Sequence, residues 1–409
     1  MATLQPFRAM RPGPSCAARI AAVPYDVVTV DQARALAADN PLSFLRVSRA
    51  ELELPPGADP YSAAVYQRAS QNFERLKESS LVIEDEPCVY FYRLRMGKHE
   101  QTGIAACYSL DEYDRDLIKK HERTRRDKED DRTRHMMALG AQTGPVFLVY
   151  RASEEVGRAA GRVVGGEPLF DFEAPDGVRH TLWRIGGADR DALVTAFASI
   201  ATLYIADGHH RAASAARARA EIRERGAGRP SLGDGADDST FLGVAFPHDQ
   251  VQILPYNRIV MDLGGLTPDA FLQAVRDRFE LAAGSPMPAQ RSEISMYFKG
   301  SWHRLRPRVR PDQSGILSLD VSVLQDQLLA PVLKVVDQRT DRRIDFVGGA
   351  RGPGELEQLV DSGKAAVAFS LYPVSIFDLM AVSDAGGIMP PKSTWFEPKL
   401  RDGLLIHMI

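Results

Sequence analysis

The run most suited to chemistry is Asp207-Gly208-His209-His210-Arg211, which lies between an expected strand and an expected helix. A glycine lets the backbone turn and approach a ligand closely, and the N–H groups at the start of a helix favour an anion. An arginine can clamp phosphate oxygens, while the histidines add donors or a proton acceptor and the aspartate can bind a metal ion. The run therefore predicts a site for a small anion such as phosphate. A tight turn with incidental polar residues is the alternative.

A second candidate is Lys120-His121-Glu122. A carboxylate at Glu122 could accept the proton of a weakly nucleophilic hydroxyl, as a general base does. The alternative is a solvated helical face, because residues 119–134 alternate in charge. Several basic residues nearby could contact phosphate or lie on the surface: Arg125, Arg126, Lys128, Arg132, Arg134 and His135.

A third candidate is Pro391-Lys392-Ser393-Thr394 near the C-terminal end of the sequence. A lysine beside two hydroxyls can bind a phosphate or a substrate carboxylate. The hydroxyls could instead cap backbone groups.

Two further runs are candidates for the same site. Asn257 and Arg258 follow Pro255-Tyr256 and could bind substrate. Tyr25 and Asp26 could also reach a site, although a strand start or a turn explains that run equally well.

The elements that must position these residues are strands and helices in alternation, which predicts a mixed α/β (α+β) fold. A strand over 202–206 and a helix over 212–225, ended by Gly226, flank the first run, and a polar loop over 229–238 follows. Gly97-Lys98 is expected to join a hairpin of strands 89–96 and 104–110. The other expected strands are 145–150, 180–185, 240–246, 251–255 and 365–371, and the other expected helices are 31–38 (capped by Asp31), 61–77 and 193–200.

The composition is that of an ordinary globular protein. The 409 residues are 44% hydrophobic and 26% charged, with a net charge of −3, so the sequence lacks the basic excess of a nucleic-acid-coating protein. No apolar run is long enough for a membrane span or a signal peptide. The three cysteines form no Cys-x-x-Cys pair, which argues against a zinc site or a disulfide framework. We therefore expect a cytoplasmic protein that does not bind nucleic acid or membranes.

The run at 207–211 resembles the second motif of the ParB/sulfiredoxin-like superfamily, and most closely that of its free-serine kinases. Lys120-His121-Glu122 and Pro391-Lys392-Ser393-Thr394 are similar to two other segments of those kinases. His209 stands where sulfiredoxins have a nucleophilic cysteine, so sulfiredoxin chemistry is not expected. No helix-turn-helix follows Arg211, as it would in a ParB partition protein. The wide spacing between Glu122 and Asp207 implies an insertion around residues 150–195.

Over its full length the chain is similar to a large bacterial family of unknown function (domain of unknown function 1015). The hallmarks of that family stand in this sequence at 6–8, 24–28, 120–122, 207–211, 255–258, 343–349 and 391–394. The resemblance implies three regions: an N-terminal α/β region (1–110), a ParB/sulfiredoxin-like phosphate-binding core (111–262) and a C-terminal α/β region closing the cleft (263–409).

The resemblance to the kinases implies transfer of a phosphoryl group to free L-serine, with Mg²⁺ and either pyrophosphate or ATP/ADP as donor. A nucleotide-binding regulator and a phosphate ester or anhydride hydrolase are the alternatives, and the oligomeric state stays open, a homodimer being one option. The implied catalytic residues are Glu122, Asp207 and His209, with Asp207 also holding the metal ion. The implied donor-binding residues are Gly208, His209, His210, Arg211, Lys392, Ser393 and Thr394. The implied substrate-binding residues are Lys120, His121, Asn257 and Arg258.

Overall fold

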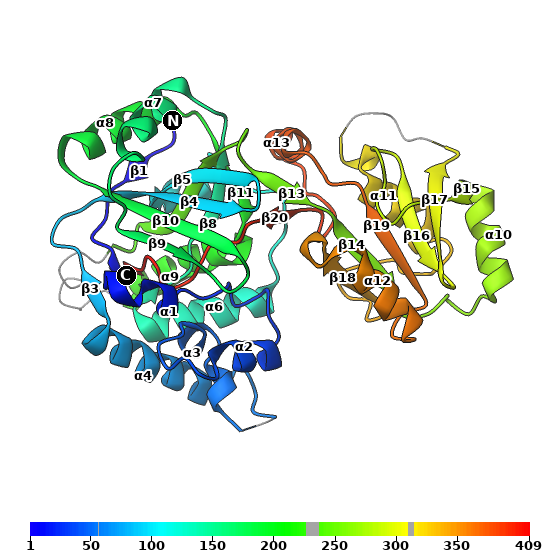
Figure 1. Ribbon diagram of the computed structural model, residues 1–409, viewed down its shortest axis with the longest axis horizontal. Helices are drawn as coiled ribbons and strands as arrows, with labels where there is room; N and C mark the ends of the chain where they lie inside the picture. The colour runs from blue at the N-terminus through cyan, green and yellow to red at the C-terminus, as the bar shows by residue number, and fades with distance from the viewer. Residues whose placement is uncertain (56, 226–236, 310–314) are drawn as a thin grey trace. The chain divides into compact units, whose positions relative to one another are not determined.

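The computed structural model describes residues 1–55, 57–225, 237–309 and 315–409, and the chain forms two compact units (Figure 1). Unit 1 comprises Met1–Lys120, Thr124–Val251 and Pro398–Ile409. Unit 2 comprises His121–Arg123 and Gln252–Glu397. The expected boundary after residue 110 falls inside unit 1, and the one after residue 262 falls inside unit 2. The assignment of a phosphate-binding core to 111–262 stays a prediction.

Unit 1 is built on a nine-stranded mixed sheet with the order β6-β11-β8-β12-β5-β4-β10-β9, in which β1 also pairs with β5. Strand β11 runs antiparallel to β8, and β8 runs parallel to β12. The strands of this sheet are β1 (Leu4–Gln5), β4 (Val89–Met96), β5 (His99–Ser109), β6 (Ile118–Lys119), β8 (Val146–Tyr150), β9 (Phe170–Glu173), β10 (Val178–Ile185), β11 (Leu203–Asp207) and β12 (Thr240–Pro247).

Helices of unit 1 share two apolar cores. Side chains of α6, α7, α8 and α9 pack with the sheet in one core, and the N-terminal helices α1 to α4 form the other. The helices are α1 (Ala17–Ile20), α2 (Val30–Ala37), α3 (Leu45–Ser48), α4 (Ala63–Ser79), α5 (Leu110–Asp114), α6 (Arg126–Leu139), α7 (Glu154–Val163), α8 (Gly187–Phe197) and α9 (His209–Arg225). Two short ribbons complete the unit: β2 (Met10–Pro12) with β3 (Leu81–Ile83), and β7 (Ala141–Gln142) with β21 (His407–Met408).

Unit 2 contains a six-stranded antiparallel sheet with the order β15-β17-β16-β19-β14-β18. Its strands are β14 (Tyr256–Val260), β15 (Phe279–Ala283), β16 (Ile294–Phe298), β17 (Ser301–Pro307), β18 (Ile344–Gly348) and β19 (Val367–Leu371). A separate ribbon pairs β13 (Gln252–Leu254) with β20 (Trp395–Glu397). The helices are α10 (Pro268–Arg278), α11 (Asp320–Leu324), α12 (Gly352–Asp361) and α13 (Ile376–Asp384).

The mixed α/β class is confirmed, as is the hairpin of β4 and β5 through Gly97-Lys98. The cap of α2 differs from the expectation: Thr29, and not Asp31, accepts the backbone N–H of Gln32 in a capping box. The expected stop at Gly226 and most of the polar loop 229–238 lie outside the described residues. Within the described ranges, no helix is both long and apolar enough to cross a membrane.

Candidate functional site

The turn at Gly208 connects strand β11 directly to helix α9, as the sequence predicts. Gly208 has φ +95°, a conformation that favours glycine. A Cβ atom at this position would also lie 3.3 Å from Cα of Val146. The carbonyl of Gly208 accepts the backbone N–H groups of Arg211 (2.9 Å) and Ala212 (3.1 Å), so the helix begins at His209 and not at residue 212. The turn therefore sets Asp207 at the end of the strand and His209 at the N-terminus of a helix.

Asp207 is held by a residue of the C-terminal segment of unit 1. Nζ of Lys399 donates to Oδ2 of Asp207 at 2.9 Å. The Lys399 side chain is 12% exposed and that of Asp207 30%. The sequence reasoning missed Lys399, because nothing in its local sequence distinguishes it from a surface lysine.

The guanidinium of Arg211 lies inside unit 1. Nη1 donates to the carbonyl of Pro145 at 2.8 Å, and Nη2 donates to Oδ1 of Asp26 at 3.4 Å. Burial lowers the pKa of the Arg211 guanidinium. The carboxylates of Asp26 and Asp402 raise this pKa by more, so the net pKa lies above the usual value. Arg211 therefore stays charged in a buried position.

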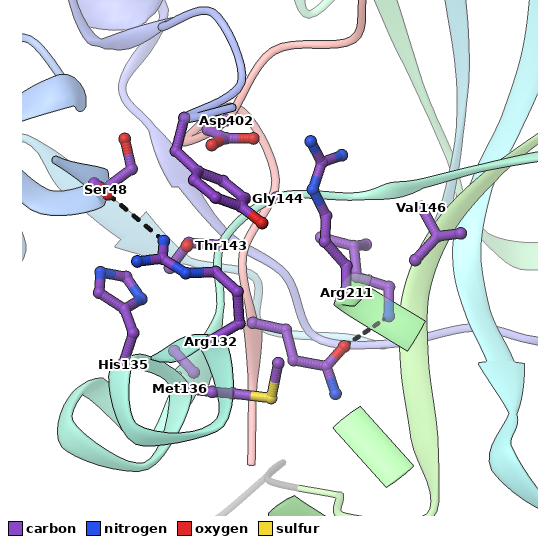
Figure 2. Close-up of a pocket in the computed structure, with 13 residues that line it drawn as sticks. Ser48, Arg132, His135, Met136, Thr143, Gly144, Val146, Arg211 and Asp402 are labelled. Atoms are coloured by element: carbon purple, nitrogen blue, oxygen red, sulfur yellow. Dashed lines mark hydrogen bonds between the residues drawn. The ribbon is translucent and has the colours of Figure 1, made fainter. Parts of the chain in front are cut away.

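A small pocket of about 40 Å³ opens beside Arg211, and all of its lining residues belong to unit 1 (Figure 2). Arg132 of α6 places its guanidinium 4.1 Å from the ring centre of Tyr25, and that of Arg211 lies 6.0 Å from the same ring. Tyr25 and Asp26, whose role the sequence left open, therefore lie with Arg211. Arg132, grouped with basic residues that could contact phosphate or lie on the surface, is 14% exposed at its side chain.

Asp402 supplies a buried carboxyl group to the pocket. The residue is 3% exposed, and its Oδ1 atom has no hydrogen-bond partner among the described residues. A Cβ atom on Gly144 would lie 2.5 Å from this oxygen, so the glycine makes room for it. Burial raises the pKa of Asp402 to about 7, a rise that Arg211 partly offsets. Like Lys399, Asp402 lies in the C-terminal segment and was not found from the sequence.

The histidines near the turn have different environments. His209 is buried, and Nε2 of His210 accepts the backbone N–H of Arg125 at 3.0 Å. In the pocket, Nε2 of His135 is 2.9 Å from the carbonyl oxygen of Val47. Burial lowers the pKa of His135 to about 4, so this side chain is neutral near pH 7.

Unit 2 brings two of the other predicted segments together. The carbonyl of His121 accepts the backbone N–H of Met389 at 2.8 Å, and Nε2 of His121 lies 3.4 Å from Oγ1 of Thr394. Ser393 donates its hydroxyl to the carbonyl of Pro390 at 2.6 Å. This hydroxyl therefore caps a backbone group, which is the alternative to phosphate binding given by the sequence. Glu122, next to His121, is partly buried.

Arg258 supports the Pro391-Lys392 loop. It is fully buried, donates through Nη2 to the carbonyl of Pro391 at 3.0 Å, and has a pKa lowered to about 9 by burial. Nζ of Lys392 lies 5.6 Å from the ring centre of Tyr256. Asn257 accepts the backbone N–H of Leu371 at 3.2 Å. The side chains of these two β14 residues, Asn257 and Arg258, thus form hydrogen bonds with the protein itself.

Lys120 belongs to unit 1 and contacts Tyr113, a residue seven positions earlier in the chain. Its Nζ donates to the carbonyl of Tyr113 at 2.8 Å and lies 4.1 Å from the centre of the ring of the same residue. The predicted residues are therefore divided: Lys120 and 207–211 are in unit 1, while His121, Glu122, 257–258 and 391–394 are in unit 2.

The chain is similar to a family that is recognisable over most of its length. Residues 4–322 match the family described as "Protein of unknown function (DUF1015)". No curated protein matches the chain.

Among solved structures, the chain is similar to a free serine kinase in complex with AMP, with 13% identity, a TM-score of 0.36, and coverage of 74% of this chain and 92% of that chain. A conserved hypothetical protein from Pyrococcus furiosus gives 13% identity and a TM-score of 0.36, with coverage of 75% and 95%. SbnI with a C-terminal truncation, from Staphylococcus aureus, gives 10% identity and a TM-score of 0.38, with coverage of 74% of this chain and 87% of that chain. Such low values leave activity to be argued from the residues of this chain.

Proposed function

Given that this chain belongs to the DUF1015 family, we propose that it is a phosphotransferase that converts free L-serine to O-phospho-L-serine. The observation that carries the proposal is the turn at 207–211, where a strand, a left-handed glycine and a helix N-terminus follow one another. Helix N-termini bind phosphate through backbone N–H groups and the helix dipole. In the proposal this turn belongs to a ParB/sulfiredoxin-like core.

The donor phosphates would bind at Gly208, His209, His210 and Arg211. Lys399 adds a positive charge next to Asp207, at a distance of 2.9 Å. Phosphoryl transfer depends mainly on positioning and on stabilising negative charge, and a cluster of this kind supplies both. The donor would be pyrophosphate or ATP/ADP, because the residues of this turn recognise phosphate and not a base.

Asp207 would hold Mg²⁺ together with phosphate oxygens. One carboxylate fits this role, since protein-bound Mg²⁺ commonly takes one or two carboxylates and completes its shell with phosphates and water. The ion would neutralise charge on the phosphates when bound. The ion pair of Asp207 with Lys399 orients the carboxylate.

Glu122 would accept the proton of the serine hydroxyl as the new O–P bond forms and the bond from phosphorus to the leaving group breaks. His209 would assist as a further catalytic group. Lys392, Ser393 and Thr394 would contact the donor. Lys120, His121, Asn257 and Arg258 would contribute to serine binding, with Arg258 acting through the Pro391 loop that it supports.

The test incubates the purified full-length chain with L-serine and Mg²⁺, with ATP, ADP or pyrophosphate supplied separately. We expect O-phospho-L-serine, identified by ³¹P NMR and mass spectrometry, with at least one donor. D-serine under the same conditions is the control for recognition of the free amino acid. The absence of product with every donor would overturn the proposal. Phosphate release independent of serine would identify a hydrolase instead, and nucleotide binding without turnover would identify a regulator.

A further inference from the structure

The pocket beside Arg211 presents hydrogen-bonding atoms that the protein itself does not use. Oδ1 of Asp402 and Oγ of Ser48 are both buried and have no hydrogen-bond partner among the described residues. Both residues line the pocket (Figure 2). A buried polar atom without a partner destabilises the folded chain, which favours a ligand that satisfies both atoms.

The two arginines of the pocket add donors. Arg132 donates through Nε to Oδ2 of Asp131 at 2.9 Å and through Nη1 to the carbonyl of Ser48 at 3.4 Å. Arg211 donates to Pro145 and Asp26. A guanidinium has five N–H groups, so these bonds use only part of each fork. Both forks can therefore also bind the oxygens of a small anion.

Charge alone does not select the ligand, because each arginine already faces a carboxylate. Arg132 pairs with Asp131, and Arg211 pairs with Asp26. Recognition must therefore come from the pattern of donors and acceptors. An ionised carboxylate only accepts hydrogen bonds, so an oxyanion oxygen placed at Asp402 must carry a proton. Phosphate keeps a proton near neutral pH, whereas sulfate has none.

We propose that this pocket binds hydrogen phosphate, free or as the terminal group of a phosphate donor, and that Asp402 selects it over sulfate by accepting a hydrogen bond from its P–OH group. A pocket of about 40 Å³ offers more space than one water molecule needs, so its size does not exclude a larger polar ligand. Arg211 takes part both in this inference and in the proposed function. The inference rests on the proposed function only for the biological origin of the phosphate.

The preference for phosphate over sulfate depends on pH because Asp402 is titratable. Burial raises its pKa to about 7, so the carboxylate form prevails in mildly alkaline solution. In acid the protonated carboxyl donates a hydrogen bond to sulfate as readily as to phosphate. The titratable and charged groups around it are Arg211, Asp26, Arg132, Arg401, Tyr25 and His135.

Isothermal titration of the full-length chain with sodium phosphate and with sodium sulfate, at matched ionic strength and mildly alkaline pH, tests this proposal. We expect phosphate to bind at least about tenfold more tightly. Asp402→Asn should bring the two affinities close together, because an amide can donate to either ion. The matched control Asp31→Asn changes a carboxylate with a 92% exposed side chain and should leave the preference unchanged.

Ser48→Ala tests the same pocket in case Asp402→Asn fails to fold. The hydroxyl of Ser48 has no partner among the described residues, so its loss should leave stability almost unchanged while weakening phosphate binding several-fold. Equal affinities for the two ions in the unmodified chain, or a preference that survives in Asp402→Asn, would overturn the proposal.

Neither serine nor a nucleotide is present in these titrations. A chain that selects phosphate but makes no O-phosphoserine would contradict the proposed function alone. A chain that makes O-phosphoserine but does not discriminate between the ions would contradict this inference alone.

Discussion

Lys399 and Asp207, far apart in the sequence, form an ion pair in which Nζ donates to Oδ2 at 2.9 Å. The lysine lies in the C-terminal segment of unit 1, whereas the aspartate ends strand β11. Asp402, only three positions after Lys399, lies near Arg211 at the other end of the same motif. The C-terminal segment therefore completes the surroundings of the predicted phosphate-binding turn.

Lys399→Met should lower kcat/KM for phosphoryl transfer by about tenfold, because the turn loses a positive charge that compensates phosphate. It also leaves Asp207 without this partner, which should cost about 1–3 kcal/mol of unfolding free energy. Steady-state kinetics and urea denaturation check the two effects. Lys98→Met, at an exposed position of unit 1, is the matched control and should change neither. Wild-type kinetics in Lys399→Met would exclude a role for the lysine.

Glu122→Gln should reduce kcat by about 10²–10⁴-fold, because the amide cannot accept the proton of the serine hydroxyl. Donor affinity, measured by titration without serine, should change little since the proposed donor-binding residues do not include Glu122. Glu155→Gln, an exposed carboxylate of α7, serves as the control. Normal turnover in Glu122→Gln would show that another group is the base.

Arg211→Lys should weaken donor binding by about tenfold or more, because lysine keeps the charge but lacks the planar fork. The conservative change retains a cation beside Asp26, which protects the fold. Titration with ADP and with pyrophosphate, supported by circular dichroism, measures the effect. Unchanged affinity for both would argue against phosphate contact by Arg211.

Gly208→Ala should destabilise the chain by about 1–2 kcal/mol, because residue 208 has φ +95° and L-residues are strained in this region. The close approach of Val146 adds to the cost. Gly161→Ala is the contrasting control: this glycine lies within helix α7, and a Cβ atom added to it would meet nothing within 4 Å. Alanine there should stabilise the helix by about 0.5–1 kcal/mol. Urea unfolding that ranks the two variants in the opposite order would refute this account.

Stability should depend on pH through Asp402. Its pKa is raised to about 7 in the folded chain, against about 4 when unfolded. Between these values only the folded state holds the proton, so the unfolding free energy falls as pH rises, by about 1.4 kcal/mol per unit of pKa difference. Asp402→Asn should remove this fall.

Unfolding curves of both proteins, measured from about pH 4.5 to about pH 8, give the comparison. His135 and His407 have pKa values lowered to about 4, so they produce the opposite slope between about pH 4 and 6.5. They are present in both proteins and cancel in the difference. A difference in unfolding free energy that does not vary with pH would contradict the assignment.

The turn at 207–211 was predictable because its signals are local. Apolar residues before Gly208 and a long Ala- and Arg-rich stretch after it indicate a strand and a helix, and only a glycine fits the conformation between them. The β4–β5 hairpin follows for the same reason. Local signals also mislead: Asp31 is a good capping residue, yet Thr29 caps α2 because Gln32 completes its capping box.

The rest of the site depends on contacts between distant segments. Asp402 and Lys399 lie in a segment without a motif, and only the fold places them at the turn. Asp26 and Tyr25 stood in a recognisable run, but the same run is compatible with a strand start. The role of Arg132 could not be predicted because it is one of several neighbouring charged residues, and the sequence alone does not distinguish the buried face of α6 from its exposed face.

The arrangement of unit 1 also constrains the order in which it can form during translation. Residues 398–409 belong to unit 1 but follow 252–397, which make up most of unit 2. A ribosome must therefore synthesise all of unit 2 before Lys399 and Asp402 emerge. Until then the nascent chain contains the Asp207–Arg211 motif without Lys399, which pairs with Asp207, and without Asp402 of the adjoining pocket. The motif therefore receives its full set of charges only after unit 2 has been synthesised.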